Sequence, residues 1–428
     1  MSVTAVLRTL GARVSGALQV MTGQALYSLA NFLTILAVGA WSGQEELGAY
    51  ALGLSCYVLA YSMGDTLVAT PYTYFRARPL RDARDLEAVA AWGTFIVASL
   101  VGVGLTLAWW GDVSGLARLW PVLPIAIVFG LMREYTRRQL VAQGRLTRLF
   151  RIDLAASLTH MAGIVALGLA GLLSARSAYV VMTLAAWVIF IPMRSAAQWR
   201  RIASAGTDLR AVLGDYIEYG RWLFLGGVCH VGSVQIYPWL AMLGGGERQA
   251  GLYAACAALV NLLGPLFLGL TNYFRPLFMA AFHQRGATGF LSYVVKRGLL
   301  FVAPAVVVAL AVVAEGGNVL SLLYGESYRT AAPALMWMSL GMCAVAASAA
   351  LQLALLAMRA PATNLYYHGT ALLLLVVVAW LLREQLSLMT LGRMYGAINV
   401  AAFVVLGWLC FSVWRAQPDA RRILSRSA

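Results

Sequence analysis

The sequence predicts an all-α polytopic membrane protein, with about twelve transmembrane helices in two six-helix lobes around a central cavity. Three observations lead to this prediction: the composition, the length of the apolar runs, and the distribution of charge between them. Of the 428 residues, 61% are hydrophobic and only 11% are charged. A soluble domain has about 25% charged residues. The composition therefore excludes a secreted enzyme, a cytosolic enzyme and a disordered chain.

Twelve apolar runs are bounded by charged or turn residues, and most are close to the roughly 20 residues that a helix needs to cross the hydrocarbon core. Two of them, the fourth and the ninth, are shorter. The runs cover residues 20–41, 47–70, 88–110, 119–136, 153–173, 178–197, 221–243, 250–273, 298–314, 331–357, 364–382 and 394–414.

The cations between these runs predict the topology. The net charge is +15, from 32 Lys+Arg against 17 Asp+Glu. If both termini are cytoplasmic, 26 of the 32 cations fall on the inner side, as the positive-inside rule requires. One missed or extra helix would scramble this bias. Topogenic charge therefore explains the basic composition better than nucleic-acid binding, and we expect no nucleic-acid partner.

The chain is predicted to consist of two similar halves, residues 1–205 and 206–428. A polar connection near residues 199–219 lies close to the midpoint. The sequence Gly48-Ala49-Tyr50-Ala51 after the first run is matched by Gly251-Leu252-Tyr253-Ala254 after the seventh. Six helices per half preserve orientation, so the repeat would be parallel, and the transport route is expected between the two lobes.

Polar side chains recur on one face of several predicted helices. The first run carries Gln24, Tyr27, Ser28, Asn31 and Thr34, the seventh carries His230, Ser233 and Tyr237, and the eighth carries Asn261 and Asn272. Such stripes serve either interhelical hydrogen bonds or the wall of a water-filled cavity. Their recurrence in related helices favours a cavity, so we predict substrate contacts for Gln24, Asn31, His230, Tyr237 and Asn261.

Charged candidates for function are few. Asp65 is the most deeply embedded acid, and we predict either that it couples transport to a cation or that an arginine neutralises it. Guanidinium groups bind phosphate bidentately. Arg133, Arg221 and Arg275 lie at inner helix ends, where they are either binding groups for an anionic headgroup or determinants of topology.

Neither a metal site nor an enzyme active site is predicted. The histidines His160, His230 and His368 stand alone, without metal-ligand spacing. The five cysteines lie singly in apolar runs, and no nucleophile-elbow, zincin or phosphate-loop motif occurs. We therefore expect no cofactor and no metal.

Short motifs resemble one transporter superfamily. The sequences Glu46-Leu47-Gly48-Ala49-Tyr50-Ala51 and Leu323-Tyr324-Gly325-Glu326-Ser327-Tyr328 are similar to loops of the multidrug/oligosaccharidyl-lipid/polysaccharide (MOP) exporter superfamily. The sequence Arg133-Glu134-Tyr135-Thr136-Arg137-Arg138, together with Asp153 and Gly64-Asp65-Thr66-Leu67-Val68, resembles the Wzx-type flippases of polysaccharide biosynthesis.

This resemblance implies a flippase that moves undecaprenyl-pyrophosphate-linked oligosaccharide across the bacterial inner membrane by alternating access. Its partners would be the lipid-linked oligosaccharide, membrane lipid and a polysaccharide polymerase or glycosyltransferases. One alternative is a cation-coupled multidrug exporter, which predicts embedded acids in the first or seventh run, and neither run has one. A membrane-embedded polymerase or ligase would need a larger external domain, and a purely structural scaffold does not explain the polar stripes.

Overall fold

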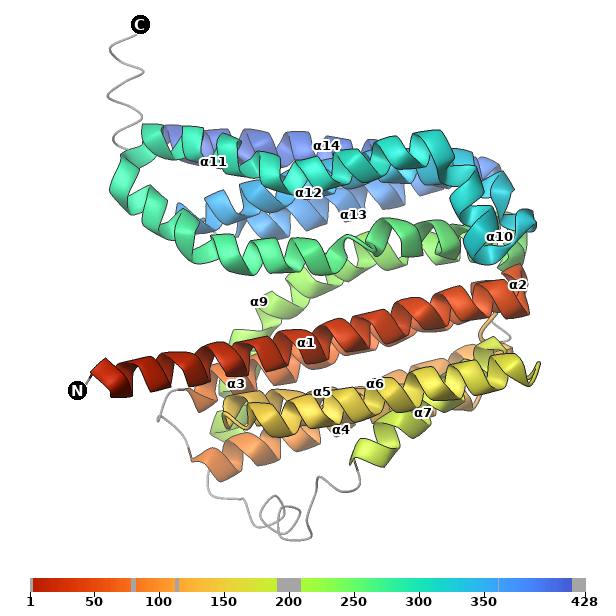
Figure 1. The fold of residues 1–428 in the computed structure, drawn as a ribbon, viewed down its shortest axis with the longest axis horizontal. Coiled ribbons are helices and arrows are strands. Elements are labelled where there is room, and N and C mark those ends of the chain that lie inside the picture. Colours follow the sequence, from red (N-terminus) through yellow and green to blue (C-terminus); the bar gives the residue numbers. More distant parts are fainter. Residues whose placement is uncertain (1–2, 78–81, 112–114, 191–208, 361, 418–428) are drawn as a thin grey trace, which may run out of the picture. The chain divides into compact units, whose positions relative to one another are not determined.

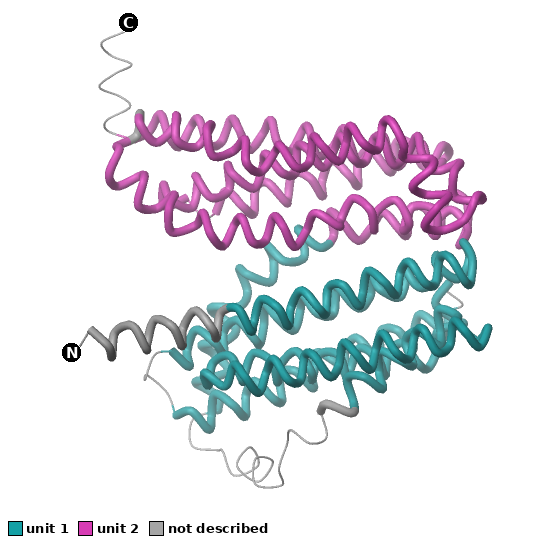
Figure 2. The backbone as a smooth tube through the Cα atoms, viewed as in Figure 1, with its two compact units in different colours: residues 1–231 teal, residues 232–428 magenta. Residues whose placement is uncertain are grey.

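The computed structural model describes residues 3–77, 82–111, 115–190, 209–360 and 362–417, and the regular structure of these residues is entirely helical. The chain forms two compact units, Met1–Val231 and Gly232–Ala428 (Figure 2). The all-α prediction is therefore confirmed for the described residues. The expected division into residues 1–205 and 206–428 stays a prediction.

The first unit contains the helices from α1 up to residue 231 of α9 (Figure 1). They are α1 (Val3–Ser42), α2 (Gln44–Gly64), the π-helical turn η1 (Asp65–Ala69), α3 (Thr70–Arg76), α4 (Ala83–Trp110), the 3₁₀ turn η2 (Ala117–Leu119), α5 (Val122–Ala142), α6 (Leu146–Leu169), α7 (Ala175–Phe190) and α9 (Leu209–Gln235). Within this unit α1 packs along α6, and α5 packs against α4 and α7.

The second unit consists of long helices joined by short turns. They are α10 (Tyr237–Asn261), α11 (Gly264–Tyr324), the 3₁₀ turn η4 (Glu326–Ala331), α12 (Ala332–Ala357), α13 (Thr363–Leu381), the 3₁₀ turn η5 (Arg383–Gln385) and α14 (Leu388–Arg415). Helix α12 packs between α11 and α14, and α13 packs against α14.

Two of these helices are interrupted by glycines in left-handed backbone conformations. Helix α10 is broken at Gly245 and Gly246, where Gly246 has φ +70°, and α11 is broken at Gly286, with φ +63°. A residue with a side chain is strained at such angles, so glycine is the residue that allows the turn. With these breaks, the described residues contain a helical segment at each of the twelve predicted runs, the sixth being described only to Phe190.

The chain is a multi-pass membrane protein. Nine segments of the described residues are long and apolar enough to span a bilayer. Large apolar side chains point outward, as for Leu100, Val307 and Leu373, each more than 60% exposed. Outward-facing apolar surface of this extent fits a lipid environment. Helix α5 is not among the nine, and its C-terminal half carries the cluster of charges described below.

Small residues allow α12 and α14 to approach closely in the second unit. A Cβ atom added to Gly392 would lie 2.8 Å from the backbone oxygen of Ala334, and one added to Gly341 would lie 2.8 Å from the ring of Tyr395. Close approach through glycine and alanine is a common way for transmembrane helices to associate, because dispersion contacts between backbones replace the missing hydrophobic drive.

This packing predicts the effect of adding one methyl group to α14. We expect Gly392→Ala to lower the stability of the purified protein by about 1–3 kcal/mol, because the methyl would collide with the backbone of α12. The matched control is Gly407→Ala on the same helix, where a Cβ atom meets nothing within 4 Å. Denaturation in a titrated detergent mixture measures both variants, and equal stability of the two would contradict the contact.

Candidate functional site

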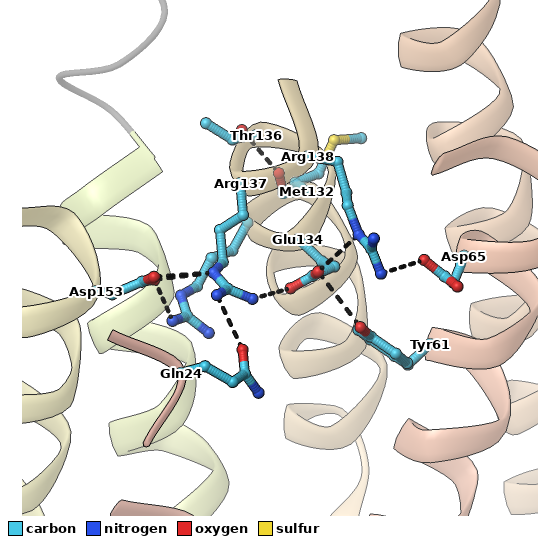
Figure 3. Close-up of polar contacts among 10 residues, drawn as sticks. Gln24, Tyr61, Asp65, Met132, Glu134, Thr136, Arg137, Arg138 and Asp153 are labelled. Carbon is cyan, nitrogen blue, oxygen red and sulfur yellow. Dashed lines mark hydrogen bonds and ion pairs between the residues drawn. The ribbon is translucent and has the colours of Figure 1, made fainter. Parts of the chain in front are cut away.

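A cluster of charged residues lies on the C-terminal half of α5. Arg133 and Arg137 are four positions apart and share one face of the helix, and Glu134 and Arg138 share the neighbouring face. This spacing directs the guanidinium groups of Arg133 and Arg137 toward α6. It directs the carboxylate of Glu134 and the guanidinium of Arg138 toward α2. Figure 3 shows the resulting polar contacts.

The carboxylate of Asp153 on α6 is the innermost charge of this cluster. It is fully buried, and it accepts hydrogen bonds from Nη2 of Arg133 at 3.1 Å and from Nε of Arg137 at 2.9 Å. Gly23 of α1 leaves room for it, because a Cβ atom there would lie 3.0 Å from Oδ2 of Asp153. The guanidinium of Arg133 also lies 4.2 Å from the ring centroid of Tyr27, a cation–π contact.

Glu134 links the two faces of α5. Its carboxylate accepts a hydrogen bond from Nη1 of Arg137 at 2.9 Å, pairs with Nε of Arg138 at 3.4 Å, and accepts from the hydroxyl of Tyr61 on α2 at 3.3 Å. Arg137 donates in addition to the side-chain oxygen of Gln24 on α1, at 2.9 Å. Four helices, α1, α2, α5 and α6, are therefore tied to one polar network.

Asp65 forms the other end of the network. Its carboxylate lies 2.8 Å from Nη2 of Arg138 and accepts a hydrogen bond from the hydroxyl of Thr70 at 3.3 Å. Asp65 begins the π-helical turn η1, in which the backbone N–H of Thr70 donates to the carbonyl of Asp65 five residues earlier. A π-turn inside an α-helix often marks a functional position, because it rotates the following residues out of register.

The network has no net charge and its members differ in exposure. Three carboxylates alternate with three guanidinium groups in the order Arg133, Asp153, Arg137, Glu134, Arg138 and Asp65. The side chain of Asp153 is 0% exposed, whereas those of Asp65 and Arg138 are 24% and 37% exposed. An embedded charge is costly unless it is paired and hydrogen-bonded. Asp65 is therefore the network acid whose charge can change at the smallest cost.

Several predicted site residues belong to this network. Asp65 pairs with an arginine, which was one of its two predicted roles, and that arginine is Arg138. Gln24 and Arg133 contact Arg137 and Asp153, respectively. Thr34, from the same stripe of α1 as Gln24, lies 3.3 Å from His160 of α6. Part of the polar stripe of α1 therefore serves interhelical hydrogen bonding, which was one of the two predicted uses of such stripes.

The other predicted residues are not among the charged residues of this network. In the first unit, Asn31 is partly exposed on α1, and Arg221 and His230 are exposed on α9. In the second unit, Asn261 and Arg275 are exposed, whereas Tyr237 is buried and stacks on Tyr253 with ring centroids 5.6 Å apart. Substrate binding by these residues, and by Gln24 and Arg133, stays a prediction.

Four charged residues of the network were not predicted as site residues: Glu134, Arg137, Arg138 and Asp153. Two signals in the sequence point to them. Arg133, Glu134, Arg137 and Arg138 have the spacing of paired helix faces, and Asp153 is an acid at the start of an apolar run. Arg133 and Arg137 pair with Asp153 on α6, and Arg138 pairs with Asp65 at the end of α2, so the spacing along α5 does not reveal these interhelical partners. In the described residues, no group of three metal-ligating side chains occurs.

The comparisons with known proteins concern the fold. No family model matches the chain, and no curated protein matches it. Among solved structures, an inward-facing multidrug resistance MATE family transporter of the MOP superfamily has a TM-score of 0.74 at 13% identity, over 91% of this chain and 96% of that one.

Two further structures have a similar fold. The lipid II flippase MurJ, in an inward closed conformation, has a TM-score of 0.65 at 10% identity, over 92% of this chain and 86% of that one. A MOP superfamily transporter from Pyrococcus furiosus, whose reverse polarity of the binding pocket suggests a different function, has a TM-score of 0.64 at 15% identity, over 95% and 96% of the two chains. The predicted resemblance to this superfamily is thus confirmed in the fold.

The burial of Asp153 predicts a large effect on stability. Asp153→Asn should lower the free energy of unfolding by about 3–5 kcal/mol, because Arg133 and Arg137 would lose their shared buried counter-charge. The matched control is Glu326→Gln, which removes an exposed carboxylate 3.1 Å from Arg329 and should leave stability almost unchanged. Unfolding of the purified proteins in a titrated denaturing detergent measures the difference. An Asp153→Asn protein as stable as the wild type would show that the network does not hold the unit together.

Proposed function

We propose, from a fold shared with transporters of the MOP superfamily, that the protein is a flippase for undecaprenyl-pyrophosphate-linked oligosaccharide in a bacterial inner membrane. It would move the headgroup from the inner to the outer leaflet by alternating access while the polyprenyl tail stays in lipid. The likeness in fold to a lipid II flippase supports this proposal, because lipid II is itself a lipid-linked sugar.

The observation that carries the proposal is the mutual neutralisation of the charges in the first unit. Asp65, Glu134 and Asp153 are each paired with arginine. A cation-coupled drug exporter needs an embedded carboxylate that is available to a cation, and the first and seventh predicted runs contain no acid. What these runs offer is uncharged hydrogen-bonding side chains, which suit the hydroxyl groups of a sugar.

The diphosphate of the substrate needs cations. Arg221 and Arg275 are exposed and lie at the predicted inner ends of helices, and none of the ion pairs among the described residues includes them. We propose that these two bind the diphosphate and that Gln24, Asn31, His230, Tyr237 and Asn261 contact the sugars. Arg133, also predicted from the sequence, has its charge satisfied by Asp153, so its release would have to accompany a conformational change.

We propose that both termini lie in the cytoplasm, because the positive-inside rule and the distribution of arginine along the sequence favour this orientation. A polysaccharide polymerase or glycosyltransferases would act on the same lipid-linked substrate. We propose transport without enzymatic activity, cofactor or bound metal.

A cation-coupled multidrug exporter is the second candidate. The TM-score of 0.74 with a multidrug resistance transporter supports it. In that case we expect Asp65 to be the coupling residue, because it is the most exposed of the three network acids and pairs with only one arginine of the network. The two candidates differ in substrate, so a transport assay separates them.

Replacing the two exposed arginines tests the flippase. Arg221→Ala and Arg275→Ala should each slow transfer of lipid-linked oligosaccharide to the outer leaflet roughly tenfold or more, because a charge-assisted hydrogen bond to phosphate is lost. The measurement is the accessibility of the oligosaccharide to a lectin outside intact spheroplasts.

The controls are Arg210→Ala on α9 and Arg415→Ala at the end of α14, which remove exposed cations outside the predicted site. They should transport normally. Normal transport by both test variants and by their double mutant would remove these arginines from the mechanism. Drug efflux by the wild-type protein without lipid transfer would favour the second candidate.

Asp65→Asn tests coupling to a cation gradient. If the carboxylate of Asp65 takes up the coupling cation, this variant should lose the dependence of transport on an imposed gradient in proteoliposomes. Arg138→Gln is the matched control, because it breaks the same ion pair and keeps the carboxylate. Gradient dependence that survives in Asp65→Asn, or that is lost equally in both variants, would contradict a coupling role for Asp65.

A further inference from the structure

The two legs of α11 form an elbow at Gly286, which we define as residues 273–301. Aromatic rings hold the legs together: the ring centroids of Phe274 and Phe301 are 5.7 Å apart, and those of Phe278 and Phe290 are 6.1 Å apart. Phe278, Phe290 and Phe301 are all fully buried. The elbow is therefore a packed element of the second unit, and Figure 1 shows the bend between its two legs.

The outer surface of the elbow carries only positive charge. Its four cations are exposed: Arg275, Arg285, Lys296 and Arg297. No aspartate or glutamate occurs from residue 264 to residue 314. No ion pair among the described residues includes any of these four cations.

Two of the guanidinium groups converge on one ring. The guanidinium carbon of Arg285 lies 5.2 Å from the ring centroid of Tyr293, and that of Arg297 lies 5.6 Å from the same centroid. Arg285 belongs to the first leg and Arg297 to the second. The fold thus brings two positive charges to one ring, and a single anion beside that ring would be attracted by both.

The described acids of the second unit lie at the end of its helices that is away from this positive surface. The described acids of the unit are Glu247, Glu315, Glu326 and Glu384. Glu247 follows the break in α10, Glu315 lies near the far end of the second leg, Glu326 begins η4, and Glu384 follows α13. Because successive helices of this unit run in opposite directions, these acids lie at the end away from the elbow.

Exposed apolar side chains lie among the cations. Leu300, three residues after Arg297 and four after Lys296, is 44% exposed, and Met279, four residues after Arg275, is 38% exposed. This spacing places them on the same helix faces as the cations. A water-soluble anion gains nothing from apolar neighbours. A phospholipid does, because its phosphate meets the guanidinium groups while its acyl chains cover the apolar side chains.

We infer that the elbow of α11 is a binding surface for anionic phospholipid, with the phosphate held by Arg285 and Arg297 at Tyr293. Arg285, Arg297 and Tyr293 are not among the proposed substrate residues, whereas Arg275, on the same elbow, is one of them. The inference does not depend on the identity of the transported molecule. The lipid class is a glycerophospholipid with net negative charge, such as phosphatidylglycerol.

The test compares lipid binding by the full-length protein and its variants. In nanodiscs of phosphatidylcholine with or without phosphatidylglycerol, the wild type should retain phosphatidylglycerol through delipidation, as measured by native mass spectrometry. In the double variant Arg285→Gln/Arg297→Gln, the preference for phosphatidylglycerol over phosphatidylcholine should fall about thirtyfold. This factor corresponds to about 1 kcal/mol of binding free energy for each of the two basic residues near an anionic surface.

The matched control is Arg383→Gln/Arg393→Gln, which removes two exposed cations from the opposite end of the same unit. It should keep the preference for phosphatidylglycerol. Tyr293→Leu and Tyr293→Phe provide a second comparison that leaves the charge unchanged. The leucine variant should bind several-fold more weakly, because it removes the ring that positions both guanidinium groups, whereas the phenylalanine variant should bind normally.

A photoreactive phosphatidylglycerol gives a readout on the wild type alone. It should label peptides from residues 273–301 in preference to peptides around residues 383–393. The inference is overturned if the double variant keeps its preference, if the control variant loses it equally, or if label is spread evenly. It is also overturned if polyprenyl pyrophosphate protects the elbow from labelling and phosphatidylglycerol does not.

Discussion

The first unit depends on one interaction, the burial of the Asp153 carboxylate between Arg133 and Arg137. A charge with no exposure in a membrane-spanning unit is tolerable only if opposite charges and hydrogen bonds replace water. Two guanidinium groups supply this, and Arg137 extends the pairing to Glu134 and Gln24. The positions of α1, α5 and α6 are coupled through a single carboxylate.

The same network becomes more accessible toward its other end. Asp65 and Arg138 are partly exposed, and Asp65 stands on a π-turn, where a change in helical register requires the smallest rearrangement. Transporters that alternate between two states need both a stable scaffold and a place that can change. In this unit one line of alternating charges provides a buried end suited to stability and an exposed end suited to change.

Charge has a different role in the second unit. Its described acids and the cations of the α11 elbow lie at opposite ends, and the elbow combines guanidinium groups with exposed apolar side chains. The network of the first unit neutralises its three arginines internally, and the elbow leaves its arginines to an external anion. The network and the elbow therefore use the same residue type in opposite ways.

The sequence by itself determined the all-helical membrane fold, the positions of the twelve helical segments and the superfamily likeness. Run length and hydropathy are local properties, and Gly246 and Gly286 mark turns because glycine alone tolerates those backbone angles. Only the tertiary structure decided which charges pair. Asp153 and Arg133 are on different helices, and Arg285 and Arg297 reach the same ring of Tyr293 only because the two legs fold together. Electrostatic partners across helices depend on rotation and depth, which no local pattern of residues encodes.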